Sequence, residues 1–362
     1  MAYYFNLPTD AEITEHQRSA INDTDAIALT GGPGTGKSVV SVYRHLNNYK
    51  FDIRKSVLLT YTKSLRFYLA NSIRSEIPKS ISKQEQLKLE QAYLNVDKSF
   101  SWVGVQCDEI IIDEAQDLSE NQIGEWIYGN LTYIKNYSQR ISFGADNNQI
   151  LYRDKATGED RLREIFPNNR SHFLEENFRN TYEILNFAKC FFEDFIIPTK
   201  TLEFLLKDNK RGQKPIFKIV QNESEQNKII IQIIKSFINT NNTHNIAILL
   251  PLIHAARSIT RTVRYFYNML VENNLNCSYF ENDTTETVDI QNIHVCTFKS
   301  SKGLEFDTVI IPDFHFFSDN IANLRIIKEE DYYVAFTRAK SNLFLISNQY
   351  LDFIDIETID IE

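Results

Sequence analysis

Residues 31–38 read GGPGTGKS and fit the pattern G-x-x-x-x-G-K-[S/T]. The apolar run Ala26 to Thr30 precedes this stretch, and the amphipathic segment Lys37 to Tyr49 follows it. A strand, a glycine-rich turn and a helix in this order direct successive backbone N–H groups and the positive end of the helix toward an anion. The pattern therefore predicts a phosphate-binding loop within an α/β fold.

Each part of this loop has a chemical task. Glycines let the main chain approach phosphate oxygens, the Lys37 ammonium reaches the β- and γ-phosphates, and the Ser38 hydroxyl coordinates magnesium. A nucleoside triphosphate with Mg²⁺ is therefore the expected ligand. The residues of the loop expected to bind it are Gly32, Pro33, Gly34, Thr35, Gly36, Lys37 and Ser38.

A second chemical element lies at residues 108–117, which read DEIIIDEAQD. Three consecutive isoleucines indicate a buried strand, and the acids after them project from the carboxyl edge of the sheet, where ligands of open α/β sheets bind. Asp113 is expected to hold magnesium, directly or through water, and Glu114 to orient and deprotonate the attacking water. The two elements together predict hydrolysis of a nucleoside triphosphate.

Length and composition are typical of a globular protein of about two domains. Of the 362 residues, 43% are hydrophobic and 24% are charged, and a domain commonly has roughly 100 to 200 residues. The sequence shows no membrane-spanning run and no signal peptide, so a cytoplasmic location without membrane contact is expected. The four cysteines lack CxxC or zinc-finger spacing, which predicts neither a zinc site nor disulfides.

Charge is segregated along the chain, whose net charge is −9. The last thirteen residues carry five acids and no Lys or Arg, whereas residues 198–218 carry six basic residues and two acids. The basic stretch is expected to be a strand-contacting face, a dock for a partner or a solvated surface. If it contacts a strand, neutralising Lys210, Arg211 and Lys214 weakens binding of single strands and lowers its salt dependence.

Short apolar runs alternate with longer amphipathic stretches, as in parallel sheets with crossover helices. We expect a first domain over residues 1–170, with a small insertion around residues 66–100, and a second over residues 171–362. The expected strands are Ala26–Thr30, Ser56–Tyr61, Glu109–Asp113, Ser142–Gly144, Ile216–Val220, Ile246–Leu250, Ile293–Thr297, Thr308–Ile311 and Leu343–Ile346. The main expected helices are Lys37–Tyr49, Ser64–Ser75, Asn180–Phe192, Ser224–Ile238 and His254–Asn273.

The ordered motifs resemble those of the superfamily 1 helicases of the UvrD/Rep type, over residues 15–346. This resemblance implies two RecA-like P-loop NTPase domains with parallel sheets, an ATP site in the cleft between them, and ATP and Mg²⁺ as cofactors. Residues 13–21, ITEHQRSAI, look like the adenine-reading motif, with Gln17 as the reading amide. Residues 144–152, GADNNQILY, look like the third motif, with Gln149 as the γ-phosphate sensor.

Three later motifs imply further nucleotide contacts. Residues 174–180, LEENFRN, resemble the motif that supplies an arginine, here Arg179, with Phe178 as the ring that stacks on adenine. Residues 297–306, TFKSSKGLEF, place Glu305 at the nucleotide, and residues 334–340, VAFTRAK, place Arg338 as a second arginine finger. The catalytic residues implied are Lys37, Asp113, Glu114, Gln149, Arg179 and Arg338.

The resemblance also implies that the chain binds single-stranded DNA. Residues 58–65, LLTYTKSL, look like the motif that touches the strand, and Tyr61 stands where the family has a base-stacking aromatic, although a ring packed on its own domain is the alternative. The contacts implied are Tyr61, Thr62, Thr297 and Lys299. Because arginines of a facing domain reach the γ-phosphate only on closure, ATP binding would drive a step along the strand, in the family's 3′ to 5′ direction.

Three departures from the family pattern bear on this reading. Tyr152 is followed by Arg153-Asp154-Lys155-Ala156 where relatives have a W-R-G-A-like segment, and Val39 replaces an arginine that covers adenine. The spans between the motifs leave room for only a stunted first insertion and no second one. Because such insertions contact duplex and partners, the sequence predicts a motor core that works as a subunit.

Two functions from different classes follow. The first is an ATP- and Mg²⁺-dependent motor on single-stranded DNA, within a larger DNA-repair or phage-defence complex. The alternative is a nucleotide-controlled regulatory ATPase subunit, partnering a nuclease or other effector, without autonomous unwinding; the departures and the acidic tail favour it. An RNA motor is a third reading, because backbone contacts need not detect the 2′-hydroxyl.

Overall fold

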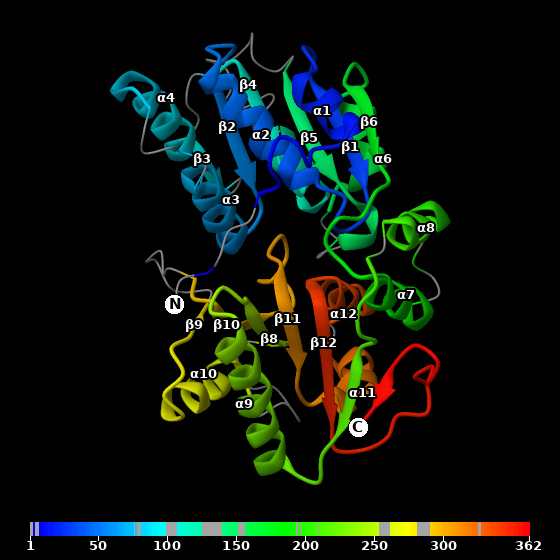
Figure 1. Ribbon diagram of the computed structural model, residues 1–362. Coiled ribbons are helices and arrows are strands. Elements are labelled where there is room, and N and C mark those ends of the chain that lie inside the picture. The colour runs from blue at the N-terminus through cyan, green and yellow to red at the C-terminus, as the bar shows by residue number, and fades with distance from the viewer. Residues whose placement is uncertain are drawn as a thin grey trace. The chain divides into compact units, whose positions relative to one another are not determined.

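The computed structural model describes residues 3, 7–75, 77, 81–98, 107–124, 140–150, 156–192, 195, 197–208, 210–252, 261–280, 290–324 and 327–362. The chain forms two compact units, residues 5–177 and residues 178–362 together with residues 1–4. Each unit is built around a parallel sheet with helices packed on it (Figure 1). The expected pair of RecA-like α/β domains is therefore confirmed, and the chain passes from one unit to the other between Asn177 and Phe178.

The N-terminal unit, residues 5–177, contains a six-stranded sheet in the order β3-β2-β4-β5-β1-β6, with parallel neighbours throughout. Its strands are β1 (Ile27–Gly31), β2 (Ser56–Thr60), β3 (Val96–Lys98), β4 (Glu109–Ile112), β5 (Ile141–Ala145) and β6 (Arg170–Leu174). Its helices are α1 (Glu15–Asn22), α2 (Lys37–Lys50), α3 (Lys63–Ser75), α4 (Lys83–Leu94), α5 (Glu120–Gly124) and α6 (Gly158–Ile165), with 3-10 turns η2 (Ala115–Asp117) and η5 (Asn147–Gln149).

Strand β1 shows why this sheet is buried on both faces. Ala28 packs in one apolar cluster with Ile110, Ile112 and Phe143, whereas Ile27 and Leu29 pack in a second cluster with α1 and α2 residues. Successive side chains of a strand point to opposite faces. Both faces of β1 are therefore covered, which explains why its sequence reads as a continuous apolar run rather than an alternating one.

The C-terminal unit, residues 178–362 with residues 1–4, contains a seven-stranded parallel sheet in the order β13-β7-β12-β11-β8-β10-β9. Its strands are β7 (Ile216–Ile219), β8 (Ile246–Leu250), β9 (Ser278–Tyr279), β10 (Ile293–Thr297), β11 (Phe306–Ile311), β12 (Ala339–Ser347) and β13 (Asp360–Ile361). Its helices are α7 (Tyr182–Phe191), α8 (Thr199–Lys207), α9 (Glu223–Thr240), α10 (Val263–Glu272), α11 (Phe317–Asn323) and α12 (Glu329–Phe336), with a 3-10 turn η6 (Phe314–Phe316).

All nine expected strands are present, with shifts of a few residues at their ends, and the two longest gains are at the starts of β11 and β12. Four strands, β3, β6, β9 and β13, were not expected, and all but β6 have three residues or fewer. The helix expected over His254–Asn273 is seen as α10, which begins at Val263, and residues 253–260 lie outside the described part of the chain. Among the described helices, none is long and apolar enough to cross a membrane.

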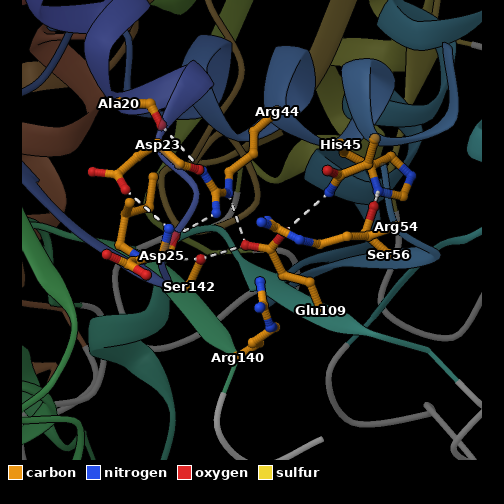
Figure 2. Close-up of polar contacts among 12 residues, drawn as sticks. Ala20, Asp23, Asp25, Arg44, His45, Arg54, Ser56, Glu109, Arg140 and Ser142 are labelled. Atoms are coloured by element: carbon orange, nitrogen blue, oxygen red, sulfur yellow. Dashed lines mark hydrogen bonds and ion pairs between the residues drawn. The ribbon is translucent and has the colours of Figure 1, made fainter. Parts of the chain in front are cut away.

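A buried ion pair lies at the start of β4 (Figure 2). Arg44 Nε of α2 donates to Glu109 Oε1 at 2.7 Å, and both side chains are almost completely buried. Asn48 and Arg54 donate to Glu109 Oε2 at 3.0 and 3.3 Å, and Ser142 Oγ donates to Oε1 at 2.6 Å. Burial alone would raise the pKa of Glu109, but the Arg44 charge and these hydrogen bonds lower it below the usual 4.5.

The same guanidinium holds the end of α1. Arg44 Nη1 donates to the backbone oxygens of Ala20 and Asp23 at 3.2 and 2.7 Å, and Nη2 donates to that of Asp25 at 2.6 Å. The carbonyls at a helix end have no partner within the helix, so a buried cation with several donors is an effective substitute. Arg44 therefore joins α1, α2 and β4 through its guanidinium, and Glu109 connects this group to Ser142 of β5 (Figure 2).

We expect Arg44→Met to lower the free energy of unfolding by about 3–5 kcal/mol, because it leaves a buried carboxylate without its main counter-charge. Arg44→Met with Glu109→Gln should lose less, since no buried charge remains. Urea denaturation at pH 7 measures both. The stabilisation by a carboxylate of lowered pKa is present above the ordinary pKa of Glu and disappears as the pH falls through the lowered value. Equal losses in the two variants at pH 7 would show that the charge is not the cause.

Candidate nucleotide-binding site

The loop between β1 and α2 is held in a tight turn. Gly34 and Gly36 have φ angles of 73° and 88°, which L-residues rarely adopt. Gly31, at the end of β1, lies so close to β6 that a Cβ there would be 2.5 Å from the backbone oxygen of Leu174. Helix α2 begins after Gly36 without a side-chain cap. Its first N–H groups are therefore not held by a capping side chain and are available to an anion.

Lys37 lies inside this loop. Its Nζ donates to the backbone oxygens of Gly31 and Gly32 at 2.6 and 3.0 Å, and it lies 3.7 Å from Asp146 Oδ2. Both charged side chains are buried. The ammonium is thus already placed at the loop where phosphates are expected, with three oxygens around it.

Ser38 and Asp113 come together although they are distant in sequence. Ser38 Oγ, in the first turn of α2, donates to Asp113 Oδ2 at 2.7 Å, and Asp113 follows β4. A hydroxyl and a carboxylate are the hard oxygen ligands that Mg²⁺ prefers, usually together with phosphate oxygens and water. The two residues therefore fit the magnesium ion that the sequence predicts.

A series of hydrogen bonds begins at Glu114 and runs along the edge of the sheet. Its backbone is left-handed, with φ 58°, and its Oε2 accepts from Gln116 Nε2 at 2.6 Å. Gln116 Oε1 accepts from the backbone N–H of Asp146 at 3.2 Å, and Asp146 Oδ2 accepts from Gln149 Nε2 at 2.5 Å. The structure thus links Glu114 to Gln149 through two residues that sequence reasoning did not assign. A non-glycine residue with positive φ is uncommon and is enriched at functional sites.

Gln17 contacts the loop directly. Its Nε2 donates to the backbone oxygen of Thr35 at 3.1 Å, and its Oε1 accepts from the backbone N–H of Thr14, which completes a capping box on α1. The side chain is buried. The structure places Gln17 against the phosphate loop, and its reading of adenine stays a prediction.

The C-terminal unit brings Arg179 and Glu305 together. Arg179 Nε lies 3.2 Å from Glu305 Oε2, and Lys340 Nζ lies 2.8 Å from Glu305 Oε1. Burial would raise the pKa of Glu305, but the charges of Lys340 and Arg179 lower it to about 2. Lys340 was not assigned from the sequence, although it closes the VAFTRAK motif. Glu305 is therefore ionised at neutral pH and is held between two cations.

Arg338 and Phe178 have well-defined surroundings in the same unit. Arg338 is 1% exposed, and its guanidinium donates to the backbone oxygens of Val334 and Leu304 at 3.1 and 3.4 Å. Phe178 is half-buried, with Lys210 Nζ 5.1 Å from its ring centroid, and Lys210 also donates to its backbone oxygen at 3.0 Å. Lys210 is thus engaged with the ring expected to stack on adenine.

The residues expected to contact nucleic acid already make contacts within their own units. Thr62 Oγ1 accepts from the backbone N–H of Leu65, and Tyr61 packs against an apolar cluster of the N-terminal unit. Thr297 bonds to Ser300, whereas Lys299 Nζ lies 3.8 Å from Asp331 Oδ2. A strand-binding role for them stays a prediction. The departure at residues 153–155 lies outside the described residues.

Two models of known protein families match this chain. The family model described as Schlafen group 3, DNA/RNA helicase domain, matches residues 25–241, more than half of the chain. The chain belongs to this helicase family. A second model, described as UvrD-like helicase C-terminal domain, matches residues 266–350. The superfamily 1 assignment made from the motifs is thereby confirmed for this helicase chain.

One curated relative of this helicase chain comes from Acanthamoeba polyphaga mimivirus and is named "Putative ATP-dependent DNA helicase R568". It is 29% identical over an alignment of 249 residues, and the match covers 65% of this chain and 34% of the relative. The chain therefore spans about a third of the length of that relative.

Solved structures of several helicases are similar to this chain at low identity. A complex of an arterivirus helicase, nonstructural protein 10, with DNA has a TM-score of 0.41 and 13% identity, and covers 94% of this chain and 65% of its own. The helicase of PRRSV has a TM-score of 0.40 and 12% identity, over 92% of this chain and 54% of its own. The C-terminal domain of a possible DNA helicase from Lactobacillus plantarum WCFS1 has a TM-score of 0.36 and 15% identity, over 51% of this chain and 98% of its own.

We expect Gly36→Ala to lower the free energy of unfolding by about 1–2 kcal/mol, because an L-residue is strained at this positive φ. The new Cβ would also lie 2.3 Å from Gln17 Nε2 and displace that amide. Gly32→Ala is the matched control, since its Cβ would meet no atom within 4 Å. Urea denaturation without nucleotide measures both. Similar losses in the two variants would contradict the explanation from backbone strain.

Proposed function

We propose that the chain is an ATP- and Mg²⁺-dependent superfamily 1 motor that acts on single-stranded DNA. The observation that carries the proposal is the group of Lys37, Ser38, Asp113 and Glu114 at one edge of the N-terminal sheet. This is the set of groups that phosphoryl transfer to water needs: a cation for the phosphates, oxygen ligands for a metal, and a carboxylate base. Membership of a helicase family supports the link to nucleic acid.

The chemistry is assigned to these side chains as follows. Lys37 binds the β- and γ-phosphates, while Ser38 and Asp113 hold Mg²⁺, which when bound neutralises charge on the phosphates. Glu114 accepts a proton from water as the water oxygen attacks the γ-phosphorus and the bond to the β–γ bridging oxygen breaks. Gln149 orients the γ-phosphate. The Gln116 hydrogen bond restricts the Glu114 carboxylate, so that the base does not have to be oriented during the reaction.

Arg179 and Arg338 would complete the site from the C-terminal unit. In our proposal ATP draws the two units together, and these guanidinium groups stabilise the charge that develops on the γ-phosphoryl group. Arg338 must first exchange its hydrogen bonds to Val334 and Leu304 for the nucleotide. Catalysis would then depend on a conformational step, and that step could be coupled to movement along a strand.

The strand would lie on Tyr61, Thr62, Thr297 and Lys299, with Tyr61 stacking on a base. The name of the mimivirus relative supports DNA as the polymer, whereas the family description includes both DNA and RNA. We further propose that the chain works within a larger repair or phage-defence complex. The support for this step is the lack of sequence for large insertions between the motifs.

The regulatory ATPase subunit is the second candidate. The burial of Arg338 favours it, because an arginine finger held by backbone oxygens suits an enzyme that is inactive until a partner or strand changes its structure. The two candidates differ in one measurable property. A motor hydrolyses ATP faster with single strands alone, whereas a regulatory subunit needs its protein partner.

We expect Lys37→Ala to reduce kcat for ATP by about 100-fold or more through loss of a phosphate contact. Glu114→Gln should reduce kcat by ~10²–10⁴-fold, because the amide cannot accept the proton, yet leave ATP binding intact. Steady-state hydrolysis with and without single-stranded DNA, duplex DNA and single-stranded RNA, at one low salt concentration, measures both. Substantial residual turnover in the two variants would refute the site, and a rate indifferent to every nucleic acid would favour the regulatory subunit.

The basic stretch yields a separate prediction. Lys214 is exposed, whereas Lys210 contacts Phe178 and Arg211 lies 3.2 Å from Glu183. If this stretch contacts the strand, Lys214→Ala should weaken single-strand binding and reduce its salt slope by about 0.7, the contribution of one phosphate contact. Lys210→Met should instead weaken ATP binding, since it removes the support of Phe178. Fluorescence titrations with a labelled oligonucleotide and a labelled nucleotide distinguish the two; an unchanged salt slope for Lys214→Ala excludes that contact.

A further inference from the structure

Residues 175–181 connect the two units, and they start beside the phosphate loop. Strand β6 ends at Leu174, which pairs with Gly31 at the end of β1. The connection therefore leaves the sheet at the position where the phosphate loop also leaves it. It ends at α7, which begins at Tyr182 in the C-terminal unit.

The first half of this connection is bonded to the phosphate loop. Asn177 is completely buried, and its Nδ2 donates to the backbone oxygen of Pro33 at 2.8 Å. Pro33 directly precedes Gly34, one of the two loop glycines with positive φ. A buried amide–carbonyl bond is costly to leave unmade, so a change in the loop at Pro33 must move Asn177 or lose the bond.

The second half is bonded to the segment that carries Arg338. Asn180 is also buried, and its Nδ2 donates to the backbone oxygens of Thr337 and Ala339, at 3.2 and 2.6 Å. These two carbonyls flank Arg338. An amide nitrogen has two hydrogens, so Asn180 uses both to hold the turn between α12 and β12. The backbone N–H of the next residue, Thr181, donates to the Lys340 oxygen at 3.0 Å and extends the contact.

We propose that Asn177 and Asn180 are positioning residues that couple the phosphate loop to the Arg338 turn. The proposal rests on the proposed ATPase function. Three residues of extended chain span at most about 10 Å, so the connection between the two anchors has little slack. The residues between them are Phe178 and Arg179, the expected adenine-stacking ring and the first arginine. A nucleotide that reshapes the loop at Pro33 therefore shifts both of these side chains and the turn that holds Arg338.

The side-chain amides of both asparagines donate to backbone carbonyls, and we expect each residue to act through those carbonyls. Loss of either amide should leave the phosphate loop able to bind ATP while Arg338 is no longer placed by it. The effect should thus fall on kcat and not on ATP affinity. Because the two anchors act in series, removal of the second should add little to removal of the first.

The test compares Asn177→Ala, Asn180→Ala and the double variant with Asn169→Ala. Asn169 is a matched control, because its Nδ2 also donates to two backbone oxygens, those of Ile27 and Ile141, at 3.2 and 2.7 Å, away from the loop. We expect Asn177→Ala and Asn180→Ala, the crossover variants, to keep ATP affinity within about threefold of wild type and to lose about tenfold or more in kcat. The double variant should have about the same kcat as the single variant with the lower kcat. Asn169→Ala should keep the kcat of the wild type.

A second measurement does not depend on turnover. Hydrogen exchange of the peptide covering residues 333–343 should slow on addition of ATP and Mg²⁺ to the wild-type chain, and this response should disappear in the crossover variants. Asn177→Leu and Asn180→Leu, which keep the side-chain volume, replace any alanine variant that fails to fold. If the wild type does not hydrolyse ATP, the proposed function fails while exchange still tests the coupling. The proposal is overturned if the kcat losses of the two single variants multiply in the double variant. It is also overturned if the exchange response is preserved in the crossover variants.

Discussion

The close approach of β1 and β6 is the constraint on which the site depends. Gly31 pairs with Leu174, and no larger residue fits, because a Cβ would be 2.5 Å from a backbone oxygen. The parallel order β4-β5-β1-β6 brings the ends of these strands to one edge. Asp113 after β4, Asp146 after β5, the phosphate loop after β1 and Asn177 after β6 thus meet there, although Pro33 of the loop and Asn177 are 144 positions apart in the sequence.

The strands and the phosphate loop could be predicted because their signals are local. An apolar run buried on two faces, or a glycine-rich turn between a strand and a helix, is visible within about ten residues. Strand β6 was missed because most of its side chains are exposed or partly exposed, so it has no apolar run. Lys340, Asn177 and Asn180 were missed because their partners are distant side chains or backbone carbonyls, and such pairings leave no pattern of residue types in the sequence. Gln116 was missed although Glu114 is two residues away, because its second partner is the distant backbone N–H of Asp146.

The charge distribution also has a different meaning in the folded protein. The stretch of basic residues suggested a cationic face, but Lys210 supports Phe178, Arg211 pairs with Glu183, and Lys218 pairs with Glu362. Arg44 and Glu109 show the same principle at full burial, where one ion pair connects four elements. These basic side chains therefore have partners within the fold. The number of basic residues in a segment thus overstates the positive charge that is available to a polyanion.

The surroundings of Lys37 bear on how the phosphate loop would distinguish a nucleoside triphosphate from the phosphates of a nucleic-acid strand. Its ammonium is surrounded by two carbonyl oxygens of its own loop and by Asp146. The charge of this buried ammonium is therefore largely compensated by oxygens of the protein itself. A single phosphate of a nucleic-acid backbone would replace only one of the contacts that Lys37 makes with these oxygens. A triphosphate with its metal ion offers enough contacts to replace them all. In the proposed function, the loop would thus distinguish ATP from a nucleic-acid strand by the number of contacts that each offers to Lys37.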